Sequence, residues 1–204
     1  MRHKAEEFGI IYSDYPPYEV IKTKWMSPRE LYDLKLVEDV VEKYSNEDYF
    51  ENTLNKFVGE SPFEFFSDFG KFWKEKGYHL MSHRRVDLYE KLHEFLKESY
   101  DETEFVEHLR LDFLINQNIN PPKYLNPMGI EMKYYHEILK DEGVREIFGV
   151  PLDIPTKKLV NSFRFEKFHF SADMEIYGIY YSTMGNIKVN ITKEVERILN
   201  GLYK

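Results

Sequence analysis

The sequence predicts a mainly α-helical protein: a bundle of five or six helices, followed by a small antiparallel β-sheet and a short C-terminal helix. Capped starts that lead into apolar residues at helical spacing predict the bundle. The stretch "SFRFEKFHFSADMEIYGIYYSTMGNIKVNI" instead alternates with a period of two and is rich in aromatic and β-branched residues, which is typical of strands. The run "TKEVERIL" after it has the pattern of a short helix.

Three segments carry the signature of a helix start. "SPRE", from Ser27 to Glu30, has a capping serine, a proline at the first helical position and a glutamate three residues after the serine. "SPFE" from Ser61 repeats this pattern, and "DETE" from Asp101 has aspartate as the cap. The first start is followed by one apolar stripe, made of Leu31, Leu34, Val37, Val41 and Tyr44.

Similar stripes predict helices after "SNED", around "YEKLHEFL" and, more weakly, from Met132 to Leu139. Between the last two, "NQNINPPKYLNPMG" (116–129) is rich in proline and asparagine, which predicts a loop packed over the bundle. We therefore divide the chain into a connector at 1–26, a helical bundle at 27–160, and a β-meander with its final helix packed on the bundle at 161–204.

The β-segment poses a question of register. Phe163 and Phe165 have one parity and Phe168 and Phe170 the other, so a regular strand places the two pairs on opposite faces. A bulge at Glu166–Lys167 would bring all four onto one face, and we expect it there. Turns are expected near Ala172–Asp173 and Gly185–Asn186.

Composition excludes several classes of function. The net charge of −8 argues against a nucleic-acid partner, because phosphate-backbone affinity is carried by Lys and Arg. No apolar run approaches the ~20 residues that span a bilayer, and "MRHKAEEFGIIYSD" has no signal-peptide core, so we expect no membrane partner and a cytoplasmic location. Zero cysteines exclude a disulfide, a thiol nucleophile and a cysteine-held iron–sulfur cluster in this chain.

The segment "YPPYEVIKTKWMSPRE", from Tyr15 to Glu30, is the best candidate for an interaction surface. Its two prolines predict an extended or polyproline conformation, and the residues after them alternate as in a strand. A connector lying on the bundle is the simpler interpretation. The candidates for interaction or substrate contact in this segment are Tyr15, Pro16, Pro17, Tyr18, Lys22, Lys24 and Trp25.

Other polar residues are weaker candidates. Arg84 and Arg85, next to His83, could bind an anion, although a charged helix start is the simpler interpretation. Asp112 lies in the very apolar "LRLDFL", where a buried carboxylate needs a partner such as Arg110, a backbone amide or a tyrosine hydroxyl. A structural anchor is favoured over a ligand contact.

Histidine spacing gives little support to a metal site. His79 and His83 are four residues apart, and "EKLH", from Glu90 to His93, has the Glu-x-x-His spacing of di-iron bundles. Such a site needs two of these motifs and two further glutamates, and the sequence has one. We assign no catalytic, cofactor-binding or metal residue to this chain.

A family resemblance suggests a context. In order, "GIIYSDYPPYEVIKTKWMSPRELYDLK", "SPFEFFSDFGKFWKEKGY" and "LRLDFLINQNINPP" resemble the C-terminal domain of unknown function of bacterial cobalamin-binding radical-SAM proteins, often catalogued as iron–sulfur oxidoreductases. The resemblance covers about residues 8–122 and is weaker from Tyr124 onward.

In that family the domain follows a cobalamin-binding region and a radical-SAM barrel in the same polypeptide. The resemblance thus implies a 4Fe–4S cluster, S-adenosylmethionine and cobalamin held by those partner domains, with no catalytic residue transferred to this chain. It also makes "MRHKAEEFGI" similar to the exit of the barrel's last helix, with Met1 either an internal methionine of a longer gene or an artificial start.

Three functions follow as expectations. The first is a non-catalytic accessory module that caps the barrel or positions substrate in a radical-SAM oxidoreductase or methyltransferase. The second is a stand-alone protein-interaction module, which requires an exposed aromatic patch near Tyr15, Tyr18 and Trp25. The third, and the weakest, is a helical-bundle metalloenzyme.

Overall fold

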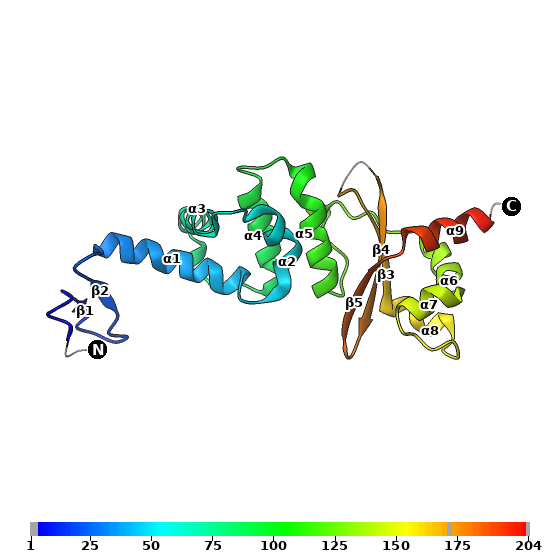
Figure 1. Cartoon of the computed structure of the whole chain (residues 1–204), viewed down its shortest axis with the longest axis horizontal. Helices are drawn as coiled ribbons and strands as arrows, with labels where there is room; N and C mark the ends of the chain where they lie inside the picture. The colour runs from blue at the N-terminus through cyan, green and yellow to red at the C-terminus, as the bar shows by residue number, and fades with distance from the viewer. Residues whose placement is uncertain (1–3, 171–172, 203–204) are drawn as a thin grey trace. The chain divides into compact units, whose positions relative to one another are not determined.

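The computed structural model describes residues 4–170 and 173–202. The fold class is confirmed: the described residues form nine α-helices, the last of them C-terminal, and a three-stranded antiparallel sheet (Figure 1). Residue contacts divide the chain into two units, 1–88 and 89–204, and the division falls within α4 (Arg85–Leu96). No helix in the described ranges has the length and apolar character needed to cross a membrane.

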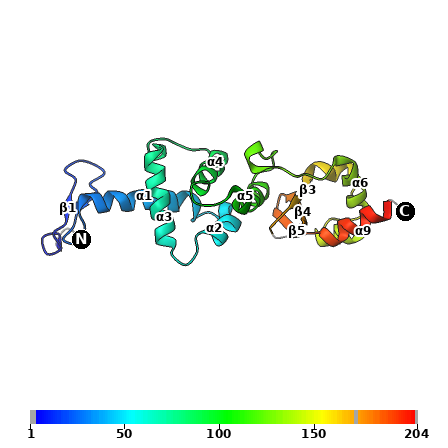
Figure 2. The ribbon, with the colours of Figure 1, turned by 90° about the horizontal axis from the view of Figure 1, so that it is seen from above.

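The first unit begins with a small β-hairpin and continues as helices. Its elements are β1 (Ile11–Tyr12), β2 (Val20–Lys22), α1 (Pro28–Tyr44), the 3₁₀ turn η2 (Asp48–Phe50), α2 (Glu51–Phe57), α3 (Pro62–Glu75), η3 (Tyr78–Leu80) and the start of α4. Helix α3 crosses α1, as the two views show (Figures 1 and 2).

An aromatic core holds the helices of this unit together. Tyr44, Phe50, Phe69 and Trp73 are buried, and the ring of Tyr44 lies 4.8 Å from those of Phe50 and Phe69. Their polar atoms are satisfied: Trp73 Nε1 donates to Asp39 Oδ2 at 2.7 Å and the Tyr44 hydroxyl donates to the Leu88 carbonyl at 3.0 Å. Such tilted aromatic contacts and paired polar tips are how large rings are buried without penalty.

The predicted helix starts have different outcomes. At Ser27 the full capping box forms, with the Ser27 side chain accepting from Glu30 N and Glu30 accepting from Ser27 N. Asp101 caps α5 (Glu102–Asn116) by accepting from Thr103 N at 2.9 Å. The start at Ser61 is confirmed in position, since α3 begins at Pro62, but the Ser61 side chain, at φ/ψ of −117°/72°, forms no capping bond.

The segment at the two prolines also differs from the prediction. The Pro16–Pro17 peptide bond is cis, Tyr18 has a φ of 53°, and the Tyr18 amide donates to the Tyr15 carbonyl at 2.9 Å. Tyr15–Tyr18 is therefore a tight turn that reverses the chain between β1 and β2, and not an extended or polyproline segment. The strand-like alternation after it is confirmed only over β2.

The second unit places a sheet between helices. Its elements after α4 are α5, η4 (Lys123–Leu125), α6 (Met132–Lys140), α7 (Glu142–Ile147), α8 (Thr156–Leu159), η5 (Val160–Ser162), β3 (Phe163–Phe168), β4 (Glu175–Ser182), β5 (Gly185–Asn190) and α9 (Thr192–Leu202). The strand order is β3-β4-β5. Within this unit, α5 lies on one side of the sheet and α6, α7 and α9 on the other (Figure 1).

The expected bulge is absent from the described strands. From Phe163 opposite Tyr180 to Phe168 opposite Glu175, β3 pairs with β4 in one unbroken register. Phe163 and Phe165 therefore enter the core shared with α6 to α9, and Phe168 enters the core shared with α5. The prediction assumed one covered face, whereas helices cover both faces and apolar residues of either parity are buried.

Two further details complete the comparison. The turn between β4 and β5 lies at Thr183–Met184, slightly before the predicted position at Gly185–Asn186. The other turn was predicted near Ala172–Asp173, and Ala172 lies outside the described residues. The short helices α7 and α8 were not predicted, since neither is long enough to show a periodic stripe.

Candidate functional site

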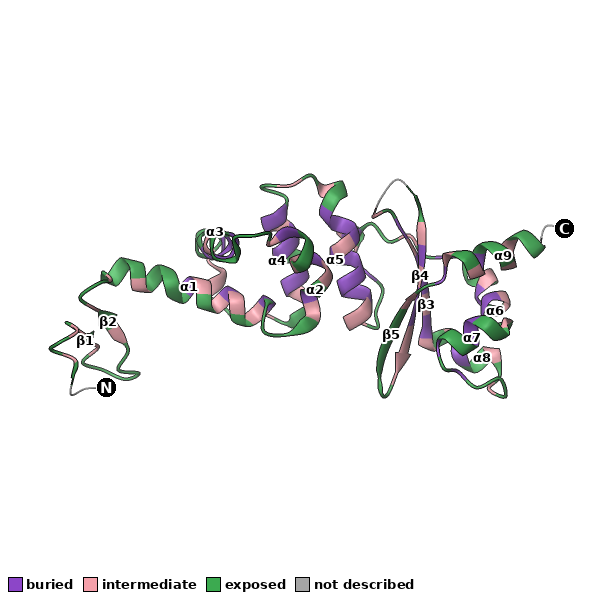
Figure 3. Cartoon of the chain, in the orientation of Figure 1, coloured by how far each residue is buried: buried purple, intermediate pink, exposed green. Residues whose placement is uncertain are grey.

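The hairpin exposes a group of large apolar side chains, which we call the hairpin surface: Ile11, Tyr15, Tyr18, Ile21 and Trp25. Tyr15 is 79%, Tyr18 51% and Trp25 67% exposed. Figure 3 shows this region mostly in the colour of exposed residues. An interaction module requires such exposure at Tyr15, Tyr18 and Trp25, and the structure provides it.

Local contacts hold this surface in place. The Ser13 amide donates to the Glu19 carbonyl at 2.8 Å, and the Lys24 amide donates to the Phe8 carbonyl at 2.9 Å. The rings of Phe8 and Trp25 lie 5.7 Å apart, and Glu19 forms an ion pair with Lys35 of α1. The hairpin is thus tied to α1 while its aromatic side chains and the predicted contact residues Lys22 and Lys24 stay in solvent.

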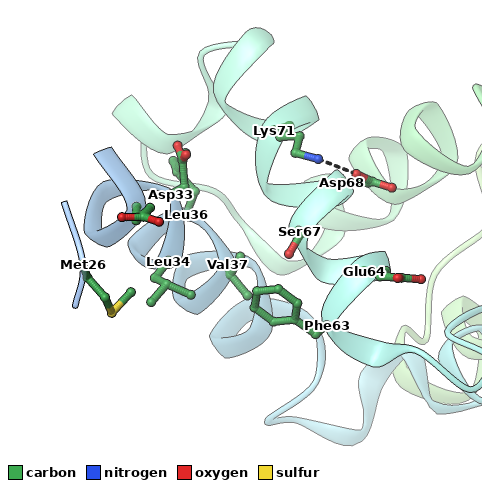
Figure 4. Close-up of a pocket in the computed structure, with 11 residues that line it drawn as sticks. Met26, Asp33, Leu34, Leu36, Val37, Phe63, Glu64, Ser67, Asp68 and Lys71 are labelled. Atoms are coloured by element: carbon green, nitrogen blue, oxygen red, sulfur yellow. Dashed lines mark hydrogen bonds and ion pairs between the residues drawn. The ribbon is translucent and has the colours of Figure 1, made fainter. Parts of the chain in front are cut away.

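A second surface feature is a groove between α1 and α3, with a volume of about 600 Å³. Its apolar side chains are Met26, Leu34, Leu36, Val37 and Phe63, and we call this set the α1–α3 groove. Leu34 and Val37 of α1 face Phe63 of α3 (Figure 4). Phe63 is 64% exposed, so the groove presents a large apolar side chain to water.

Acidic side chains surround the apolar part of the groove. Glu30 and Asp33 line it from α1, and Glu64 and Asp68 line it from α3. Hydrogen bonds from Ser27 lower the pKa of Glu30, so this carboxylate stays charged at neutral pH. The lining cation Lys71 is bound to Asp68 at 2.8 Å, and that bond raises the pKa of Lys71. The rim therefore carries a negative excess.

Sequence reasoning missed this groove because it assigned the stripe of α1 to the core. The residues of α1 that are buried are Leu36, Val40 and Tyr44, spaced four apart, whereas Leu34 of the predicted stripe is exposed. The apolar residues of α1 thus form one wide arc, and the chain buries only part of it. An arc wider than one buried face was the signal that could have indicated a further apolar contact.

The predicted anion-binding arginines are both occupied by acidic partners. The Arg84 guanidinium binds both carboxylate oxygens of Asp87, at 3.0 and 2.8 Å. Arg85 lies 3.7 Å from the centre of the Tyr49 ring and donates to Glu47 at 3.2 Å. An anion would have to compete with these contacts, so the geometry favours the simpler interpretation of a charged helix start.

Asp112 is completely buried, with its backbone carbonyl accepting from the Tyr89 hydroxyl at 3.3 Å. The polar centre of this region is its neighbour Arg110. Arg110 donates to Glu107 at 2.7 Å, to the carbonyls of Leu125 (3.3 Å) and Lys167 (2.6 Å), and to the carbonyl of Asn126. These hydrogen bonds connect the Asn–Pro loop and β3 to α5, as expected of a structural role.

The histidines of the metal hypothesis lie in unrelated settings. His79 lies in the 3₁₀ turn η3, and His83 packs against Trp73 with 4.8 Å between ring centres. His93 binds Glu102 at 2.8 Å. In the part of the chain that the structure describes, no three His, Asp or Glu side chains are grouped in a way that could hold a metal ion.

Comparison with known proteins identifies a family. A family model described as "Protein of unknown function (DUF4080)" matches residues 6–188. Neither the curated proteins nor the solved structures contain a match to the chain. The match covers both the hairpin surface and the α1–α3 groove.

Proposed function

We propose, since the chain belongs to the DUF4080 family of proteins of unknown function, that it is a non-catalytic accessory module of a cobalamin-dependent radical-SAM enzyme in the cytoplasm. In this proposal the hairpin surface packs against the barrel of that enzyme, and the module helps to cover the active site or to position substrate. The radical-SAM context comes from the resemblance of the sequence motifs around "PPYEV" and "LDFL".

The exposed aromatic side chains of the hairpin carry this proposal. Tyr and Trp are enriched at the centres of protein interfaces, because they bury much area with few rotatable bonds. Tyr15, Tyr18 and Trp25 all extend from one short hairpin that is fastened to α1. A covering role fits radical chemistry, since a closed site excludes water from reactive intermediates.

The chain itself does not fit the iron–sulfur cluster that the proposal implies. Such clusters are held by cysteine thiolates, and the sequence contains no cysteine. The cluster, S-adenosylmethionine and cobalamin are therefore assigned to the barrel and the cobalamin-binding domain, with this chain acting only through contact.

The same surface also supports the second candidate, a stand-alone interaction module with a different protein partner. The two candidates differ in the identity of what covers Tyr15, Tyr18 and Trp25. They also differ in the gene, because the accessory role requires an upstream in-frame region that encodes a Cys-x-x-x-Cys-x-x-Cys motif.

Site-specific photocrosslinking tests the accessory role. The photoreactive residue p-benzoylphenylalanine would replace Tyr18 in the product of the full reading frame, with the same residue at Leu152, which is exposed in the second unit, as the control. We expect crosslinked peptides that join position 18 to the radical-SAM barrel, and none to the barrel from position 152.

Two results would contradict the proposal. A reading frame without the three-cysteine motif would remove the radical-SAM context and leave the interaction module. Crosslinks from position 18 to a separate polypeptide, with none to the barrel, would assign the hairpin surface to another partner.

A further inference from the structure

We propose that the α1–α3 groove binds a basic amphipathic α-helix of a partner protein. The groove shares no residue with the hairpin surface, although Met26 directly follows Trp25, and the inference does not depend on the accessory role. The observation behind it is an apolar groove with an acidic rim, beside the residues that α1 already buries.

The apolar content of α1 exceeds what the chain itself buries. Leu36, Val40 and Tyr44 form the buried face of α1, and a surface helix normally needs only one such face. Leu34 and Val37, which the chain leaves wholly or partly uncovered, point with Phe63 into the groove (Figure 4). An exposed Phe and Leu at one concave site, rimmed by polar groups, is the pattern of a docking site.

The α3 wall of the groove suits a helix that lies along α3. On α3, Phe63, Ser67 and Lys71 line it at spacings of four residues, so the wall is a straight helical face two turns long. On α1, Leu34 and Val37 are three residues apart. A partner helix presents its own side chains at the same spacings, which is the basis of helix-in-groove recognition.

Close packing at Gly70 keeps the two walls in position. A Cβ atom at Gly70 would lie 3.2 Å from the Leu36 carbonyl carbon, so the missing side chain allows α3 to approach the backbone of α1. The walls are therefore preformed, which lowers the cost of ordering on binding.

Charge decides which helix fits. Four carboxylates line the groove, from Glu30, Asp33, Glu64 and Asp68, against the single ammonium of Lys71, which Asp68 already binds. A helix with Lys or Arg beside its apolar stripe meets complementary charge, whereas an acidic helix is repelled. A second copy of this chain would bring an equally acidic rim to the contact, so self-association is disfavoured.

Binding of a designed peptide to the full chain tests the inference. The probe is a fluorescent peptide of about 18 residues with Leu at helical spacing and Lys on both flanks. The matched control carries Glu in place of every Lys. We expect saturable binding of the lysine peptide, at least about tenfold weaker binding of the glutamate peptide, and amide shifts confined to α1 and α3.

Variants of the chain then localise the binding. Leu34→Ser and Phe63→Ser together replace exposed side chains, so folding is retained while affinity falls about tenfold or more. Leu152→Ser, at another exposed leucine, leaves affinity unchanged. Glu64→Lys weakens binding, and the effect of Glu64→Lys diminishes as salt rises.

Any of three results would overturn the inference. The first is equal affinity for the lysine and glutamate peptides, and the second is a loss of affinity in Leu152→Ser as large as in the groove variant. The third is amide shifts outside α1 and α3. Self-association of the chain that the Leu34→Ser and Phe63→Ser variant abolishes would also overturn it, since the groove would then belong to a second copy.

Discussion

Arg110 is a buried cation that connects α5 to the Asn–Pro loop and to β3 in the second unit. Its guanidinium binds Glu107 and three backbone carbonyls, and it lies 4.7 Å from the centre of the Phe168 ring. Burial lowers the pKa of Arg110, while the carboxylates of Glu107 and Glu166 oppose that shift. Because an arginine keeps its proton in proteins, the cluster holds a permanent charge away from water.

Arg110→Met is therefore expected to destabilise the chain strongly. Removal of the cation leaves the buried carboxylate of Glu107 with only the His169 amide as donor among the described residues, and loss of the cation from a buried pair costs about 3–5 kcal/mol in comparable cases. Urea unfolding measures the loss. Arg84→Met is the matched control, because its ion pair with Asp87 is exposed on the arginine side and its loss is expected to change the free energy of unfolding little. Similar losses in both variants would contradict the anchoring role.

Tyr181 gives a pH-dependent prediction. Burial raises the pKa of its hydroxyl from 10.0 to about 12, and the hydroxyl donates to the Leu114 carbonyl at 2.7 Å. The unfolded chain loses this proton at lower pH than the folded chain does. Tyr181 therefore stabilises the fold fully below pH 10, and this contribution is lost as the pH rises toward 12.

Tyr181→Phe is expected to be about 1 kcal/mol less stable than the wild type at neutral pH, because it lacks the hydrogen bond. The variant has no hydroxyl to titrate, so the difference between the two proteins should narrow above pH 10. Denaturant unfolding at several alkaline pH values checks this. A difference that stays constant or widens with pH would show that the Tyr181 pKa is not raised by folding.

At the residue scale, the sequence indicated the right helix but did not show how many contacts Arg110 makes. It singled out Asp112 and named Arg110 only as a possible partner, because both are charged residues in an apolar helix. The importance of Arg110 depends on carbonyls of Leu125 and Lys167, which are distant in sequence. Pattern reasoning cannot place such partners, since they are brought together only by tertiary packing.

At the element scale, helix starts with the same sequence pattern behave differently. Ser27→Ala is expected to cost about 1 kcal/mol, because the Ser27 hydroxyl accepts from the Glu30 amide. Ser61→Ala in the same pattern should cost only a few tenths, because Ser61 forms no capping bond through its side chain. Thermal unfolding of both variants makes the comparison, and equal costs would contradict the structural difference.

The elements themselves were largely predictable. Helices α1, α3 and α5 are indicated by apolar residues at helical spacing after a cap or a proline, as in α3 from Pro62. The face that a helix buries was less predictable, since the apolar arc of α1 is wide and only packing against α3 selects Leu36 and Val40. The prediction of a bulge in the sheet was wrong for a similar reason. The sequence does not show that helices cover both faces of the sheet, and with both faces covered a regular register buries all the apolar residues of β3.

At the scale of the whole molecule, function depends on the surfaces that packing leaves open. The hairpin surface was anticipated, because Tyr15, Tyr18 and Trp25 stand out in the sequence. The α1–α3 groove was not anticipated, because its residues come from two helices and their exposure follows from the crossing of α1 and α3. Both surfaces lie in the first unit, residues 1–88, which is therefore the unit to examine first for partners.

The two tryptophans allow the hairpin surface to be followed in the intact protein. Trp25 is 67% exposed, whereas Trp73 is fully buried. Acrylamide should therefore quench the fluorescence of the isolated chain mainly through Trp25, and the Trp25→Phe variant should be almost resistant to quenching. Strong quenching of that variant would show that Trp73 is not buried.

The same measurement distinguishes a covered from an open hairpin. When a partner packs on Tyr15, Tyr18 and Trp25, the indole of Trp25 leaves water and its quenching should fall to the level of the Trp25→Phe variant. We expect this protection in the complete radical-SAM enzyme of the proposed function. Binding of the basic helical peptide in the α1–α3 groove should leave Trp25 quenching unchanged, because Trp25 does not line that groove. Protection of Trp25 by the peptide would mean that the two surfaces act as one site.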